Sequence, residues 1–495
     1  MITLIADSGI QFYSKKITLK LNEKVIPTQY YWQRKEKVSD QRDRYKLDFA
    51  HQLDDGVLVP KMLLDFDDNG NITTTNFDII PAIDEDEIIQ ISKVKKCIEQ
   101  YQSIWLPAPI FKINTNTGEN IFGPIGWARM MINDMSIFQD KNNESIITFK
   151  CNFSFDTTTK ERNESYVAID ENDTVELNNL FGLSTDDNLN NNFLLEENDC
   201  GWIDEYLLTT IHGGELPKID KPLEYIANFL YLNKFLGQLE GENEIANFIL
   251  YPNNLSEAVD VDLILDIGNA RTCGLLFEGT PNATTFNFTS VKKLKLSNLS
   301  KPGTTYEKPF SMRLAFHKAK FGDFEVPKYP TLFAWASVLR LGEEANQILN
   351  EFDIPNQLLA EPANTLSSPK RYLWDTKMAE KPWEFIVKKS PDEIYYQREH
   401  VLINHLNSQF TRDGKIVVES KNNSTDLDLG HGIEPKWSKS SLMTFVIIEI
   451  LNHAVQQINS HEFRKENDAF IAIPRKLRSI ILTCPTGMSE IEQVK

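Results

Sequence analysis

One stretch of the chain, Val261 to Glu278 (VDLILDIGNARTCGLLFE), constrains the fold more than any other. An apolar run leads into Asp266-Ile267-Gly268, and a second apolar run begins at Gly274 after a short polar stretch. This pattern predicts two strands joined by a tight turn, with an acidic residue at the mouth of the hairpin. Backbone N–H groups in such a turn can face a phosphate, and a carboxylate at a strand end can hold a hydrated magnesium ion. The segment therefore indicates a nucleotide-phosphate site.

The composition is typical of a soluble, multidomain intracellular protein. The chain has 495 residues, enough for two or more domains with cores of their own. Its 71 acidic residues against 52 basic ones give a formal net charge of -19, which argues against broad electrostatic binding to nucleic acid or an anionic membrane. The sequence has no run of 18 apolar residues and no secretory leader, so we expect a cytoplasmic protein without membrane insertion.

Several other features favour structural over chemical interpretations. The five cysteines are scattered and odd in number, which favours reduced thiols over a disulfide framework or a zinc site. Cys273 and Cys484 fall in or beside predicted strands, where we expect inert core thiols. The segment 65–71 (DFDDNGN) begins like a calcium loop, but Asn76 replaces the bidentate Glu, so a hairpin turn is expected. Neither a P-loop nor a G-x-S-x-G motif occurs.

A change in sequence character near residue 258 predicts a domain boundary. Residues 1–258 contain many short apolar or alternating segments between turn signals, which indicates a β-rich accessory domain. An Asn/Asp-rich stretch at 170–199 predicts a solvated loop, and residues 221–240 have helical spacing with one apolar face. Strands and helices mix over residues 259–495.

The second domain ends in a recognisable order of elements. The firmest helix runs from Ser440 to Ser460, with a broad apolar face and a serine cap, and a strand from Ser479 to Thr483 follows. The chain stops at Lys495 inside a further predicted helix, which favours a truncated second domain.

Four segments resemble the N-terminal lobe of the Hsp70/actin-type ATPase superfamily. Asp266–Thr272 (DIGNART) matches the first phosphate motif of that family, D-[LI]-G-x-x-x-T. Leu341–Asn346 (LGEEAN) takes the place of the family's GDAAKNQ, and Lys370 and Arg371 fall on the Lys-Arg pair of NTVFDAKRLIG. The segment IILTCPTGMSEIEQ resembles AVITVPAYFNDAQR. The matches keep the family order across residues 262–495.

This resemblance implies an α/β fold, in which a ribonuclease H-like lobe of the actin/Hsp70 superfamily, a mixed sheet with helices, follows the β-rich accessory domain. It also implies ATP and Mg²⁺ as ligands, with nucleotide state coupled to the binding of partner proteins. Asp266 would face the water shell of the magnesium ion, and Lys370 would reach the γ-phosphate side. The simpler interpretations stay open: Asp266 caps its own turn, and Lys370 is a solvated surface lysine.

The same resemblance makes the whole turn a candidate cofactor site. Gly268 permits a close approach of the backbone to phosphate. Asn269, Arg271 and Thr272 are candidate phosphate ligands through side chain or amide, and Arg271 either does this or points outward. A second phosphate motif and an adenosine motif would lie beyond Lys495, so we expect weak ATP binding by this chain.

Two alternative functions stay open. One is a catalytically silent scaffold with the same fold, and the other is a small-metabolite kinase of the same superfamily. The segment between Asp375 and Trp437 departs from the Hsp70 pattern, so the small subdomain is expected to differ.

A narrower resemblance covers the whole chain. An N-terminal Asp7–Phe12 (DSGIQF), a WLPAPIF…GPIGWARM region at 105–130 and the later D-[IV]-G…RT motif together resemble the large bacterial proteins called virulence factor SrfB. Those proteins are much longer than this chain, in keeping with a truncated lobe. The resemblance implies a virulence-associated bacterial protein and adds little biochemistry.

Overall fold

The chain folds into two compact units in the computed structural model. The N-terminal unit holds most residues up to Pro252, and the C-terminal unit holds most residues from Asn253 on, together with Asp7–Gln11. The structure describes residues 1–39, 42–67, 71–74, 77–114, 120–160, 169–170, 180–183, 201–245, 247–279, 291–301, 303–319, 321, 333–351, 365–387, 397–400, 436–466 and 470–483. The predicted Asn/Asp-rich loop at 170–199 lies almost entirely outside the described residues.

The larger sheet of the N-terminal unit has seven strands in the order β1-β13-β12-β7-β8-β9-β2. The strands are β1 (Ile2–Ile5), β2 (Ile10–Lys20), β7 (Trp105–Ile113), β8 (Asn120–Gln139), β9 (Ser145–Asp156), β12 (Leu180–Gly182) and β13 (Phe248–Tyr251). The strand β1 pairs in parallel with β13, which brings the two ends of this unit together. Trp105 and Trp127 are buried in this sheet, where their rings pack the β-rich unit.

A smaller antiparallel sheet has the order β5-β4-β3-β6. It consists of β3 (Gln29–Ser39), β4 (Arg42–Gln52), β5 (Leu58–Pro60) and β6 (Ile88–Ile91), with 3-10 turns η1 (Lys61–Leu63), η2 (Phe77–Ile79) and η3 (Glu85–Glu87). The predicted hairpin at 65–71 has a bridge between Phe66 and Ile72, although its turn residues 68–70 lie outside the described residues. Asp67 accepts from the backbone amide of Asn71, so its carboxylate holds the turn together.

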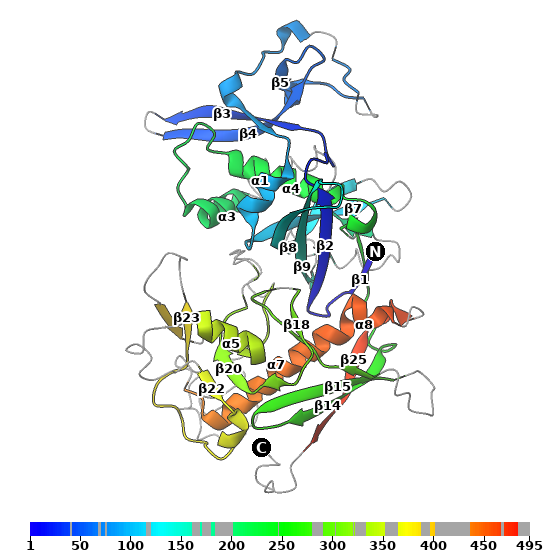
Figure 1. Ribbon diagram of the computed structural model, residues 1–495, viewed down its shortest axis with the longest axis vertical. Helices are drawn as coiled ribbons and strands as arrows, with labels where there is room; N and C mark the ends of the chain where they lie inside the picture. Colours follow the sequence, from blue (N-terminus) through cyan, green and yellow to red (C-terminus); the bar gives the residue numbers. More distant parts are fainter. Residues whose placement is uncertain are drawn as a thin grey trace. The chain divides into compact units, whose positions relative to one another are not determined.

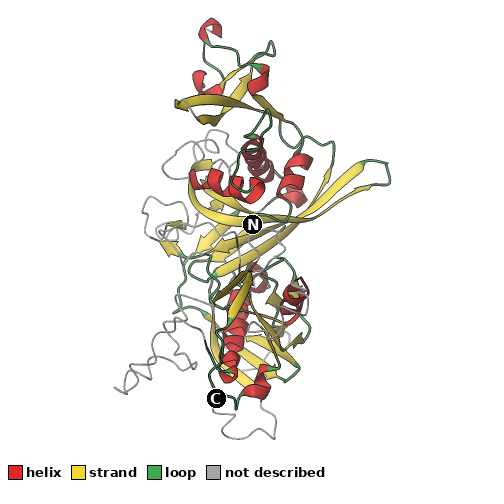
Figure 2. Cartoon of the chain, turned by 90° about the vertical axis from the view of Figure 1, so that its left-hand side faces the viewer, coloured by secondary structure: helices red, strands yellow, loops and turns green. Residues whose placement is uncertain are grey.

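Among its described residues, the N-terminal unit has three α-helices of eight residues or more, and Figure 2 shows helices beside the long strands. They are α1 (Val94–Tyr101), α3 (Gly201–His212) and α4 (Glu224–Gly237). The prediction of a single apolar face on the 221–240 helix was wrong, because every residue of α4 from Tyr225 to Leu236 is buried. Several of its polar side chains are bonded inside the unit: Asn228 donates to Gln100 over 2.6 Å, and the Asn233 amide nitrogen donates to the Phe229 carbonyl oxygen over 2.9 Å.

The main sheet of the C-terminal unit has the order β16-β15-β14-β25, and β19 also pairs with β15. These strands are β14 (Val259–Ile267), β15 (Arg271–Glu278), β16 (Val291–Lys293), β19 (Phe310–Ser311) and β25 (Arg475–Thr483). The predicted hairpin is confirmed, since β14 and β15 pair antiparallel with Ile267 opposite Thr272. In β14, Val261, Leu263 and Leu265 are buried, while the residues between them face the less buried side.

The helix α7 (Lys439–Asn459) lies across this sheet (Figure 1), close to the predicted bounds. Ser438 caps it by accepting from the amide of Ser441. By length and composition alone α7 would be able to cross a membrane, but 67% of that window is buried inside the protein. Its buried face carries Glu449 and His453, which are held in a polar network, so α7 acts as the core helix of this unit.

Smaller elements complete the C-terminal unit around this core. They are β17 (Leu296–Ser297), β18 (Thr305–Tyr306), β20 (Arg313–Phe316), β21 (Leu339–Leu341), α5 (Gly342–Glu351), β22 (Thr365–Ser367), η7 (Pro369–Tyr372), β23 (Glu384–Val387), β24 (Gln397–His400) and α8 (His461–Lys465). The N-terminal unit adds the short pair β10 (Thr159–Lys160) and β11 (Ile169–Asp170), and η5 (Gly241–Asn243). The protein is therefore a strand-rich mixed α/β structure with few helices among its described residues.

Candidate functional site

The turn between β14 and β15 has a geometry that requires glycine. The amide of Gly268 donates to the carbonyl oxygen of Arg271 over 3.0 Å and closes the turn. A Cβ atom at position 268 would lie 2.5 Å from that same oxygen. Any side chain there would force the turn to open, so this turn requires the glycine of the D-I-G sequence.

Two backbone donors of this turn are available. Asn269 and Ala270 are exposed, and within the described part of the chain no group accepts a hydrogen bond from either amide. The Ala270 carbonyl oxygen instead accepts from the amide of Met312 over 2.9 Å, which anchors the turn to the chain leading into β20. An anchored turn with free N–H groups is suited to an oxyanion such as phosphate.

Asp266 lies at the end of β14 and is exposed. Its Oδ1 atom accepts from the hydroxyl of Thr483 over 2.6 Å. Thr483 stands opposite Asp266 in the parallel pairing of β14 with β25. Because the carboxyl ends of parallel strands meet at one edge of a sheet, the two side chains share that edge. Thr483 was not among the predicted site residues, since only strand pairing reveals its position.

Lys370 is brought to the same turn from more than a hundred residues away. Its Nζ atom donates to the carbonyl oxygen of Ile267 over 2.5 Å. The lysine is on η7, which follows Ser368 in a left-handed conformation with φ of 55°. The amide of Ser368 donates to the Met312 carbonyl oxygen over 2.7 Å, so Met312 connects both segments. One ammonium group therefore stands beside the end of β14.

The remaining predicted residues divide between surface and core. Arg271 is exposed and points away from the core. Thr272 is 1% exposed, and its hydroxyl donates to the sulfur of Met312 over 2.9 Å. The Thr272 hydroxyl is thus directed into the core, whereas Asn269 and Ala270 of the turn are exposed. Arg371, the second member of the predicted Lys-Arg pair, is exposed.

The prediction that Cys273 is a core thiol was wrong. Cys273 is exposed, because the register of the hairpin places it opposite Asp266 on the less buried face of the sheet. A one-residue shift in a strand changes the face on which a side chain lies, and a continuous apolar run does not fix that register. Cys97 and Cys151 are buried, and burial raises the pKa of each thiol. Cys484 lies outside the described residues.

The site fits a magnesium ion held through water better than one held directly. Among the described residues no group of three or more His, Cys, Asp and Glu side chains is placed to hold a metal ion. Magnesium in phosphate sites commonly keeps several waters and uses one or two carboxylates together with the phosphates. Asp266, a single exposed carboxylate at the strand end, matches that requirement.

Comparison with curated proteins and with solved structures gave no match. The family model described as virulence factor SrfB matches residues 1–494, nearly the full length of the chain. The narrower of the two resemblances in the sequence is therefore confirmed. The protein belongs to the virulence factor SrfB family.

Proposed function

We propose that the C-terminal unit binds ATP with Mg²⁺ at the β14–β15 turn, as the first lobe of an actin/Hsp70-like nucleotide-binding fold. The observation that carries the proposal is the bond from Lys370 to the Ile267 carbonyl oxygen. Lys370 and the DIGNART segment were selected from motifs far apart in the sequence. Two unrelated surface features would have no reason to meet within hydrogen-bonding distance.

Each residue of the turn has a role in this proposal. Asp266 orients the water shell of the metal ion, and Gly268 lets the backbone approach the phosphates closely. The free amides of Asn269 and Ala270 supply oxyanion donors. Lys370 supplies a point charge that suits the developing charge of a transferring phosphoryl group. ATP with its metal ion supplies the phosphoryl chemistry, and these residues bind and position it.

The strand order supports the proposed ribonuclease H-like lobe. The antiparallel β14–β15 hairpin is extended on its other side by β25, which runs parallel to β14 and directly follows the α7–α8 segment. A parallel neighbour requires a crossover connection, and a helix packed on the sheet is the usual form of that connection. The exposed carboxyl end of such a sheet is where ligands bind in α/β folds.

The proposed activity is ATP binding. ATP hydrolysis or nucleotide exchange would then change the protein between two conformations that bind partner proteins differently. The family name suggests a virulence-associated setting, and we propose partner proteins, rather than nucleic acid, in the cytoplasm. A catalytically silent scaffold is the second candidate. It is favoured by the bond from Thr483 to Asp266 and by the buried Thr272 hydroxyl, since both occupy polar groups at the turn.

Calorimetric titration with Mg-ATP of this chain, its Asp266→Ala variant and a matched control tests the proposal. The control is Asp260→Ala on the same strand. The Asp260 carboxylate forms an ion pair of 3.6 Å with Lys476, at the other end of β14 from the turn. We expect weak binding that falls about tenfold or more in the Asp266 variant, because a charged contact contributes about 1.5–3 kcal/mol, and stays unchanged in the control. Equal affinities of the three proteins would exclude Asp266 from the site. Absence of binding would favour the scaffold.

A further inference from the structure

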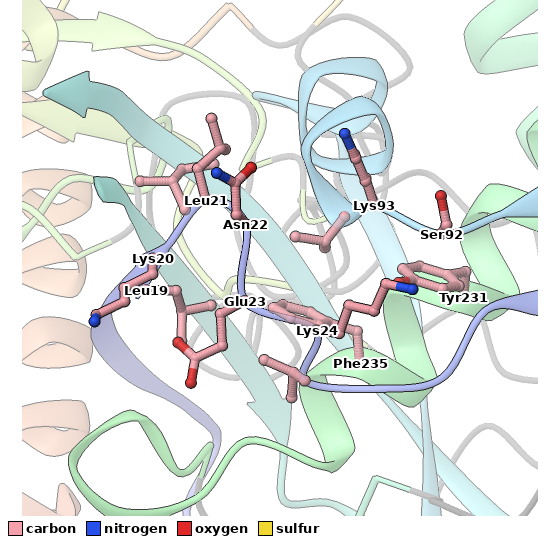
Figure 3. A pocket seen from close by; sticks show the side chains of 13 residues that line it. Leu19, Lys20, Leu21, Asn22, Glu23, Lys24, Ser92, Lys93, Tyr231 and Phe235 are labelled. Carbon is pink, nitrogen blue, oxygen red and sulfur yellow. The ribbon is translucent and has the colours of Figure 1, made fainter. Parts of the chain in front are cut away.

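The N-terminal unit holds a small pocket that is separate from the proposed nucleotide site. The pocket has a volume of about 60 Å³ and lies between residues 19–25, the start of α1, and α4 (Figure 3). Its floor is apolar and buried, and includes Leu19, Ile147 and Phe235. The lining also includes polar and charged side chains, among them Lys24, Ser92 and Tyr231.

Tyr231 is the polar group of the wall. The residue is only 3% exposed, yet within the described chain its hydroxyl makes no hydrogen bond. The hydroxyl oxygen is not one of the fully buried polar atoms that lack a partner, so it reaches the open space of the pocket, where a ligand can accept from it. Burial raises the pKa of Tyr231 to about 12, so the phenol keeps its proton at neutral pH and acts as a hydrogen-bond donor. Tyr231 therefore presents an unused donor to the pocket.

The start of α1 supplies further donors. Ser92, Lys93 and Val94 line the pocket, and Lys93 is the N-cap residue of the helix. Its side chain makes no capping bond, and the first turn of α1 contains no acidic residue. The first amides of a helix have no partner inside the helix, and the dipole makes this end positive. An oxyanion would satisfy both features.

The charges at the rim favour an anion as well. Lys24 is exposed and makes no ion pair or hydrogen bond with any described residue. Figure 3 shows its side chain extending toward Tyr231, whereas the carboxylate of Glu23 lies on the opposite side. Lys20 is already paired with Glu144 over 2.7 Å. Lys24 is therefore the lysine of this segment that is placed to pair with an anion in the pocket.

We propose that this pocket binds the carboxylate group of a short aliphatic acid. The carboxylate would accept from Tyr231, from the start of α1 and from Lys24, and its aliphatic part would contact the apolar floor. Since about 10–15 Å³ suffices for one water molecule, the pocket has room for roughly four to six heavy atoms. An apolar floor provides no donors for the further oxygens of a phosphate, which favours a carboxylate.

The test is titration of the full chain with propionate, followed by saturation-transfer NMR. We expect saturable binding that weakens about tenfold in Tyr231→Phe, which removes only the hydroxyl, and about two- to fivefold in Lys24→Gln, which changes an exposed side chain. Lys20→Gln is the matched control and should bind as the unaltered chain does. Because Lys24 is exposed, its variant gives an answer even if the Tyr231 variant does not fold.

Two competing ligands test whether binding depends on the charge of propionate or on its shape. Propionamide has nearly the same shape without the charge, and we expect it not to compete with propionate. Inorganic phosphate is expected to compete poorly. The proposal is wrong if propionate does not bind, if Lys20→Gln weakens it as much as Lys24→Gln, or if phosphate or propionamide competes as well as propionate.

Discussion

At the scale of single residues, Gly268 determines whether the turn can form. The 2.5 Å approach between a Cβ at this position and the Arg271 oxygen cannot be relieved by a rotamer change, because both atoms belong to the backbone framework. We expect Gly268→Ala to lower the free energy of unfolding by about 1–3 kcal/mol, measured by urea denaturation. Asn269→Ala, one residue later on the exposed turn, is the control and should change stability little.

Lys370 gives the second prediction at this scale. Its ammonium is half-buried beside β14, while the neighbouring Arg371 is exposed and makes no such contact with the turn. We expect Lys370→Met to weaken Mg-ATP binding about tenfold, since a contact to a charged group contributes about 1.5–3 kcal/mol. Arg371→Met should leave the affinity unchanged in the same titration. Equal losses in both variants would show that only general positive charge matters.

At the scale of elements, a buried polar network joins α7 to β21. Arg340 and Glu449 are both fully buried, and the guanidinium donates to the carboxylate over 2.6 Å. Glu449 also accepts from Trp335 over 2.7 Å and lies 3.2 Å from the Nε2 atom of His453. Although burial acts in the opposite direction, the charge of Arg340 and the hydrogen bonds from His453 and Trp335 lower the pKa of Glu449 to about 2. The carboxylate is thus ionised inside the core.

This network predicts a large effect of Glu449→Gln, because the substitution leaves the buried Arg340 charge without the carboxylate that is bonded to it. We expect a loss of about 3–5 kcal/mol at neutral pH, measured by chemical denaturation. An Arg340→Met/Glu449→Met double variant removes both charges and should lose less. A double variant as unstable as the single one would contradict this account.

The same pKa gives a pH dependence with a defined sign. The unfolded carboxyl titrates near its ordinary value of 4.5, whereas the folded one titrates near 2. Between these values the unfolded state binds the proton first, so the contribution of Glu449 to stability is lost as the pH falls from 4.5 toward 2. Glu449→Gln should lack this part of the acid sensitivity.

At the scale of the whole molecule, each unit has its own buried core. Phe229 is fully buried in α4, where its ring meets that of Tyr101 edge-on at 6.5 Å. We expect Phe229→Ala to destabilise the N-terminal unit by about 3–5 kcal/mol. Hydrogen exchange should show the loss of amide protection in that unit, with the amides of α7 unchanged. Uniform loss across both units would show that they unfold together.

The sequence predicted the elements that have a strong local signal. The β14–β15 hairpin and α7 formed where periodicity and the Ser438 cap indicated, because a continuous apolar run and a capped amphipathic pattern are local properties. The sequence did not predict that α4 is buried on all sides, because that burial depends on the tertiary packing of other elements around the helix. For the same reason Cys273 was assigned to the wrong environment.

The residues of the candidate site divide in a similar way. Asp266, Gly268 and Lys370 were selected from the sequence alone, because a motif fixes residue types at short spacing. Only the tertiary structure brings Lys370 to Ile267, places Thr483 on Asp266 and turns the Thr272 hydroxyl into the core. Such contacts join residues far apart in the chain, and their geometry follows from strand pairing and packing. The sequence alone determined the hairpin and its glycine, and the fold decided which groups meet there.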